Sequence, residues 1–110
     1  MTAYRLSLRA RQEYFDAFTY IENFSPRAAL KWQQRMLDTF DHLSKWPSSG
    51  MLRSELGPAS IRLWVEADYV VLYDPAQSPL TIISILHGTQ DLASLIAKEM
   101  AHYASEEEND

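Results

Sequence analysis

The spacing of apolar residues along the chain changes twice, and each change marks a predicted element. Residues 4–8 alternate apolar and polar side chains, which is typical of a short, half-buried strand. Apolar residues then recur every three or four positions up to residue 24, which predicts an amphipathic helix with one buried stripe. The stripe consists of Ala10, Tyr14, Ala17, Ile21 and Phe24.

Ser25 and Pro26 predict the start of a second helix. A serine side chain caps free backbone N–H groups, and a proline in the first turn loses no hydrogen bond. A second apolar stripe follows, formed by Ala29, Trp32 or Gln33, Met36, Leu37, Phe40 and Leu43. Because few residues join the two helices, residues 9–43 are expected to form an antiparallel helical hairpin, with both stripes in the core.

Beyond a loop region at residues 44–59, the spacing falls to two. This pattern predicts three strands, at residues 60–66, 69–73 and 80–87. The connections between them are short, so they are expected to form a three-stranded antiparallel meander. Asp91 is expected to cap a last helix that runs toward Tyr103. The predicted fold is α+β, with an N-terminal short strand, a helical hairpin, the meander and a C-terminal helix.

Composition and charge narrow the possible functions. We expect one domain at residues 1–104 and a disordered acidic tail at residues 105–110. The formal net charge of −5 argues against general nucleic-acid binding, although it leaves room for a local basic patch. The sequence has no cysteine, no signal-peptide pattern and no apolar run long enough for a membrane helix, so we expect a cytoplasmic protein. The three histidines lack metal-ligand spacing, and neither a metal nor a cofactor is expected.

Several short motifs occur at fixed places along these predicted elements. They are Tyr4-Arg5-Leu6-Ser7 followed by Ala10, Tyr20-Ile21, Ala28-Ala29, Leu43-x-x-Trp46-Pro47-x-x-Gly50, Arg53-x-Glu55-Leu56, Arg62, the run 69–73, and the run 82–91 with its His87-Gly88-x-x-Asp91 ending. Their order and spacing resemble the RelE/ParE toxin superfamily over about residues 4–96, and its ParE branch most closely. No single motif is decisive.

The resemblance implies the toxin of a type II toxin–antitoxin pair, of the kind described as plasmid-stabilisation proteins. A ParE-type toxin is expected to inhibit DNA gyrase by binding it and to be neutralised by a ParD-like antitoxin, whose flexible segment lies along apolar grooves. Two alternatives stay open. RelE-like members are ribosome-dependent ribonucleases, and a relative without toxicity would act only by binding an antitoxin.

The chemistry of RNA cleavage argues against the ribonuclease alternative. Such a site needs a general base, a proton donor and cations that hold the phosphate. The predicted meander contains one basic residue, Arg62, while Val70 and Gln90 occupy positions where relatives often carry arginine. His87 and Tyr103 remain as an acid or base without neighbouring cations. We therefore expect no catalytic residues and no enzymatic activity.

The candidate residues for binding the antitoxin or the target lie in and after the meander. They are Arg62, Trp64, Glu66, Tyr73, His87, Gln90 and Asp91. Each has a structural alternative: Arg62, Trp64 and Glu66 are either an ordinary exposed strand face or a binding surface, since Trp and Arg dominate binding hot spots. His87 is either a hydrogen-bonded strand end or an acid–base group, Gly88 is expected in a turn, and Asp91 is expected as a helix cap. By analogy, the target is expected to contact residues 87–100.

Overall fold

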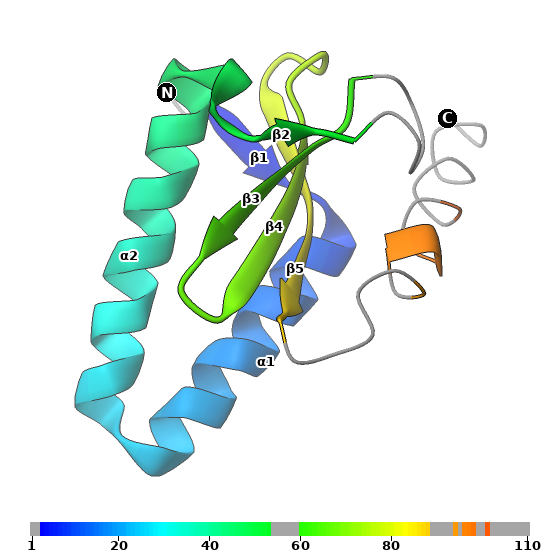
Figure 1. Cartoon of the computed structure of the whole chain (residues 1–110). Coiled ribbons are helices and arrows are strands. Elements are labelled where there is room, and N and C mark those ends of the chain that lie inside the picture. The colour runs from blue at the N-terminus through cyan, green and yellow to red at the C-terminus, as the bar shows by residue number, and fades with distance from the viewer. Residues whose placement is uncertain (1–2, 54–59, 89–93, 95, 99–100, 102–110) are drawn as a thin grey trace.

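The computed structural model describes residues 3–53, 60–88, 94, 96–98 and 101. Two long helices lie beside a twisted sheet, with the helices meeting at one end of the molecule (Figure 1). The elements in chain order are β1 (Tyr4–Leu6), α1 (Leu8–Phe24), α2 (Pro26–Lys45), the 3₁₀ turn η1 (Pro47–Ser49), β2 (Met51–Leu52), β3 (Arg62–Glu66), β4 (Tyr69–Asp74) and β5 (Leu80–His87). The α+β class and the pair of helices agree with the sequence prediction.

The sheet differs from the predicted three-stranded meander because it is five-stranded and mixed, in the order β1-β5-β4-β3-β2. The antiparallel run β3-β4-β5 lies inside this sheet. β1 joins one edge parallel to β5, and β2 joins the other edge antiparallel to β3. Alternation of residues cannot show that a distant strand joins the sheet. β2 has only two residues, both exposed, so it carries no alternation at all.

Ser residues define both ends of α1. The Ser7 Oγ accepts a hydrogen bond from the Ala10 N–H, so the helix begins at Leu8. The expected strand at residues 4–8 is therefore wrong at its end: Leu8 is helical and 75% exposed. Ser25 ends α1 through its backbone N–H, which donates to the Ile21 oxygen, and its Oγ caps the Ala28 N–H of α2. The two helices therefore share a single-residue joint.

The two helices cover one face of the sheet. Their buried stripes meet β4 and β5 in a core formed by Ala10, Trp32, Met36, Phe40, Leu43, Tyr69, Val71, Tyr73, Leu80, Ile82 and Ile85. Ring contacts run through this layer, with Trp32 packed on Tyr14 and on Tyr69 at centroid distances of 5.1 and 5.3 Å. Most residues of the two predicted stripes pack in this core, but Phe24 and Leu37 do not, since their side chains are 76% and 39% exposed.

The start of α1 completes the edge of β5 that β1 leaves open. β1 pairs with β5 only as far as Ile82. Beyond that point, Ser7 donates from its N–H to the Ile82 oxygen and from its Oγ to the Ile83 oxygen, at 2.9 and 2.8 Å. A carboxylate oxygen of Glu13 accepts from the Ser84 Oγ at 2.7 Å and from the Ile85 N–H at 3.0 Å. The polar groups of β5 beyond the end of β1 are thus hydrogen-bonded by Ser7 and Glu13 instead of by a neighbouring strand.

The other face of the sheet carries a smaller apolar cluster, Ile61, Leu72, Ile83, Leu86 and Ile96. Residues 94, 96–98 and 101 have helical backbone, whereas Asp91 and most of the predicted C-terminal helix lie outside the described residues. The predicted acidic tail at residues 105–110 also lies outside them. None of the described helices is long and apolar enough to cross a membrane.

Candidate functional site

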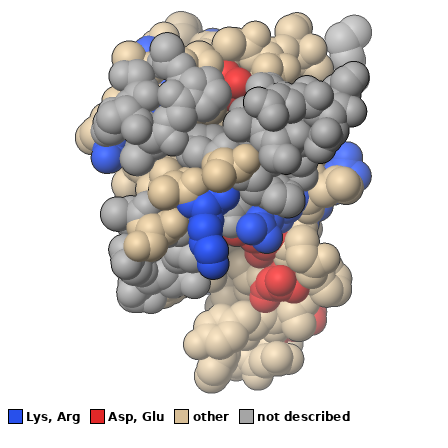
Figure 2. Space-filling model, turned by 90° about the vertical axis from the view of Figure 1, so that its right-hand side faces the viewer, with Lys and Arg blue, Asp and Glu red and all other residues tan. Residues whose placement is uncertain are grey.

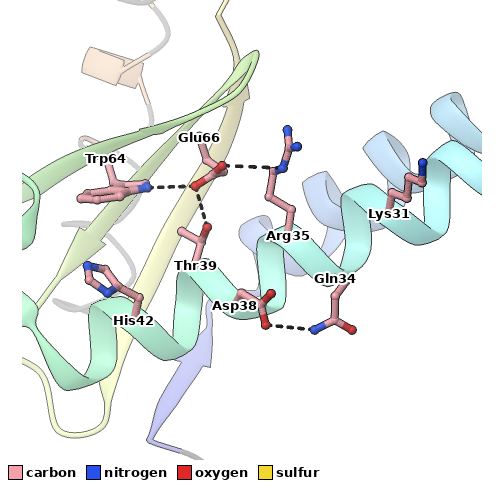
Figure 3. A pocket seen from close by; sticks show the side chains of 8 residues that line it. All are labelled: Lys31, Gln34, Arg35, Asp38, Thr39, His42, Trp64 and Glu66. Atoms are coloured by element: carbon pink, nitrogen blue, oxygen red, sulfur yellow. Dashed lines mark hydrogen bonds and ion pairs between the residues drawn. The ribbon is translucent and has the colours of Figure 1, made fainter.

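A pocket of about 580 Å³ opens between α2 and β3 (Figure 3). Its lining residues are Lys31, Gln34, Arg35, Asp38, Thr39, His42, Trp64 and Glu66. The α2 residues recur at intervals of three or four because those positions share one face of a helix. Trp64 and Glu66 lie two residues apart on β3 and therefore point to the same side of the sheet. The pocket combines charged and polar side chains with the indole of Trp64.

Glu66 is the centre of the hydrogen bonds in this pocket. One carboxylate oxygen accepts from the Thr39 Oγ1 at 2.9 Å and from the Trp64 Nε1 at 3.3 Å. The other oxygen lies 3.8 Å from the Arg35 Nε, a longer and more weakly held ion pair (Figure 3). The carboxylate therefore anchors β3 to α2. The indole of Trp64 is further held by the His42 ring, whose centroid lies 5.4 Å away.

The face formed by Arg62, Trp64 and Glu66 lies partly against α2 and the loop that follows it. The face is neither fully exposed nor free, because all three side chains are partly buried on the side that α2 covers. Trp64 and Glu66 together form one wall of the pocket. Arg62 lies outside the pocket, and its Nη1 donates to the Gly50 oxygen at 2.7 Å.

Tyr73 and Arg62 are paired residues of β4 and β3, and both side chains form hydrogen bonds to the loop at residues 47–50. The Tyr73 hydroxyl donates to the Pro47 oxygen at 2.7 Å and accepts from the Gly50 N–H at 2.8 Å. Its side chain is fully buried. Burial raises the pKa of Tyr73, while the hydrogen bond from Gly50 and the charge of Arg62 oppose that rise. Tyr73 therefore stabilises the loop from within and offers no surface to a partner, contrary to its place among the candidate binding residues.

His87 ends β5 beside the β3–β4 turn. Its ring packs edge-on against Tyr69 at a centroid distance of 5.1 Å. The Gly88 N–H donates to the Asp68 oxygen at 2.6 Å, which links the end of β5 to the β3–β4 turn, and Gly88 itself has turn geometry, as expected. Gln90 and Asp91, the last two candidate binding residues, lie outside the described residues. The structure therefore brings Trp64 and Glu66 together in the pocket. Tyr73 and Arg62 instead form hydrogen bonds to the loop at residues 47–50.

The lining residues on α2 were not among the sequence candidates. A signal was present, since Arg27, Lys31 and Arg35 repeat at intervals of four and so form one row on a helix. The sequence does not show that β3 would place a tryptophan and a carboxylate against the end of that row.

The charged surface is mixed on the side that carries the C-terminal segment. Figure 2 shows the described lysine and arginine side chains in small groups beside acidic ones, with no continuous basic surface on that face. The lower end, where α1 and α2 meet, is mainly uncharged (Figure 2). Tyr20, Phe24 and Leu30 near that joint are 62%, 76% and 61% exposed. Among the described residues, no group of histidine and carboxylate side chains is suited to hold a metal ion.

A helical pair packed on a five-stranded mixed sheet, with a mixed-charge pocket between α2 and β3, defines a small α+β protein. The comparison with known families is specific. The family of the ParE toxin of the type II toxin–antitoxin system, parDE, matches residues 4–92 of the 110-residue chain, and the chain belongs to this family. The protein is thus a toxin-type member of a toxin–antitoxin pair, which implies an antitoxin partner. The search of curated proteins finds no match.

Proposed function

We propose that this ParE-family protein inhibits DNA gyrase in the cytoplasm by binding it, without catalysing a reaction, and that a ParD-like antitoxin neutralises it. Under this proposal inhibition is stoichiometric and needs no cofactor. The alternative within the superfamily, cleavage of mRNA on the ribosome, requires cations placed around a scissile phosphate.

The observation that carries the proposal is that the Arg62 guanidinium is hydrogen-bonded to the loop at residues 47–50. Arg62 is the single basic residue between positions 60 and 85. Its guanidinium donates to the Gly50 oxygen at 2.7 Å and more weakly to the Ser48 oxygen at 3.4 Å. This cation of β3 therefore binds the loop at residues 47–50, and the nearby Tyr73 hydroxyl is hydrogen-bonded to the same loop. This arrangement favours a binding protein over a ribonuclease.

Exposed apolar side chains also support action by binding. Tyr20 and Phe24 lie edge to face on α1, with a centroid distance of 5.1 Å, and both are largely exposed. Aromatic side chains are enriched in protein interfaces, because they bury a large area at low cost in conformational entropy. The joint between the helices is thus suited to contact another protein.

The proposal is tested with purified toxin freed from its antitoxin. A supercoiling assay with gyrase is expected to show inhibition that saturates at a fixed ratio of toxin to enzyme and does not grow with incubation time. Adding the protein encoded by the neighbouring reading frame is expected to restore supercoiling, and toxin mixed with that protein beforehand is the control.

Two other results would replace the proposal. New 5′ ends in mRNA after induction, mapped by primer extension, would place the protein with the RelE-like ribonucleases. Unimpaired growth after induction, with the protein folded and present in the cells, would identify a non-toxic relative that only binds an antitoxin.

A further inference from the structure

Three cations form a row along the first half of α2, at Arg27, Lys31 and Arg35. All three are exposed. We call Arg27, Lys31 and Arg35 the cationic row. Successive members lie four residues apart, so their Cα atoms are separated by about 6 Å along the helix axis. The row leads directly into the pocket, because Lys31 and Arg35 also line it (Figure 3).

The cationic row costs the isolated protein stability. Like charges four residues apart on a helix repel each other. Arg27 also lies in the first turn of α2, where the helix dipole disfavours positive charge, and that turn contains no acidic residue. Within the described structure, the only ion pair of the row is the long contact from Arg35 to Glu66 at 3.8 Å. The fold thus maintains a repulsive arrangement that its own described acids scarcely offset.

We propose that the cationic row and the adjoining pocket are the docking surface for an acidic segment of the antitoxin. This inference rests on the proposed toxin–antitoxin function. Carboxylates that repeat every four residues of a helix, or every two residues of an extended strand, have a spacing of about 6 to 7 Å and match the row. Binding such a segment would convert the repulsion within α2 into ion pairs.

The pocket favours a peptide over a nucleic acid as the occupant. Asp38 and Glu66 lie beside the row and would repel a continuous chain of phosphates. A peptide avoids this repulsion because it carries its acids at separate positions and places neutral side chains between them. The indole of Trp64, which lines the pocket, offers an apolar contact for one such side chain. Row and pocket together fit a segment with regularly spaced acids and an apolar residue.

The test measures the affinity of the purified toxin for the protein encoded by the neighbouring reading frame, by calorimetry at low and high salt. The triple variant Arg27→Gln, Lys31→Gln, Arg35→Gln is compared with the wild type. The matched control is Arg11→Gln, another exposed helical arginine, on α1. Surface ion pairs contribute up to about fivefold each, so we expect the triple variant to bind about tenfold more weakly or worse. The control is expected to bind as the wild type does.

The salt dependence and a charge swap make the result specific. At about 1 M salt the screening length falls to about 3 Å, and the difference between triple variant and wild type is expected to shrink. As a single substitution, Lys31→Glu should weaken binding relative to the wild type. A Glu→Lys exchange in the acidic segment of the antitoxin should then restore it. Thermal unfolding of each variant confirms that the exposed substitutions leave the fold intact.

Each outcome is decisive. If the antitoxin binds the triple variant as tightly as the wild type, the docking surface is refuted while the proposed function stands. If the neighbouring protein fails to bind the wild-type toxin, the toxin–antitoxin pairing itself is refuted, and this inference falls with it. Equal weakening by Arg11→Gln would show only a general charge effect and would also overturn the proposal.

Discussion

Removing the hydroxyl of Tyr73 should destabilise the protein without changing its shape. The Tyr73→Phe substitution keeps the ring that fills the core and deletes one fully buried oxygen with two hydrogen bonds. The Gly50 N–H, which is buried, would lose its partner. The Pro47 oxygen would lose one as well, but it lies at a more exposed residue.

The size of the effect follows from those two bonds. Each hydrogen bond contributes about 0.5–1.5 kcal/mol net, and a buried donor left unsatisfied costs about 1–3 kcal/mol. We therefore expect the free energy of unfolding to fall by about 2–3 kcal/mol, out of a total of about 5–15 kcal/mol for a domain of this kind. The melting temperature is expected to fall by roughly 10 °C.

Urea denaturation followed by tryptophan fluorescence measures this change. With a slope of about 1–3 kcal/mol/M, the midpoint is expected to shift by about 1–2 M while the slope stays constant. Tyr20→Phe is the matched control, because Tyr20 is 62% exposed and the same atom is removed. A loss below about 0.5 kcal/mol for Tyr73→Phe would refute the reasoning, since it would mean that the loop does not depend on the hydroxyl.

Three further predictions follow from buried contacts of the fold. Gly50→Ala should destabilise by about 1–3 kcal/mol, because the new Cβ would lie 2.5 Å from the Tyr73 hydroxyl and 2.8 Å from the Leu63 oxygen; chemical denaturation measures it, and an unchanged midpoint would contradict it. Glu13→Ala should cost about 1–3 kcal/mol and speed amide exchange at Ile85, because Ser84 and Ile85 would lose their acceptor; unaltered exchange would show that Glu13 does not protect the edge of β5. Stability should fall as the pH rises above about 10, because an unfolded tyrosine ionises there while burial keeps the folded side chain neutral to higher pH. The tyrosinate absorbance of Tyr4, Tyr14, Tyr69 and Tyr73 should therefore rise together with unfolding rather than before it, and ionisation of all tyrosines without unfolding would contradict the raised pKa of these four side chains.

The sequence predicts those parts of the fold that depend on local periodicity and caps. The start of the second helix at Pro26 follows from the serine and proline alone, and the structure places it there. The edges of the sheet follow from contacts between residues far apart, such as the pairing of Arg5 with Thr81. No local pattern encodes such a partner, so the position of β1 in the sheet was missed.

The site divides in the same way. Alternation of residues correctly placed Trp64 and Glu66 on one face of a strand, but the hydroxyl of Thr39 that fixes Glu66 comes from a helix 27 residues earlier. Tyr73 was expected at a binding surface because it is aromatic and lies in a strand. Its hydroxyl instead meets a loop 26 residues away, and only tertiary packing decides that outcome.

The parallel pairing of β1 with β5 has a consequence for synthesis of the toxin. The paired residues Arg5 and Thr81 are 76 positions apart. At a translation rate of about 5–20 residues per second, the partner strand of β1 is made roughly 4–15 s after β1 itself. The native sheet therefore forms only after residues 80–87 have been made, since contacts distant in sequence form late. Under the proposed function, this delay separates translation from toxicity and gives an antitoxin already in the cell time to meet the nascent toxin.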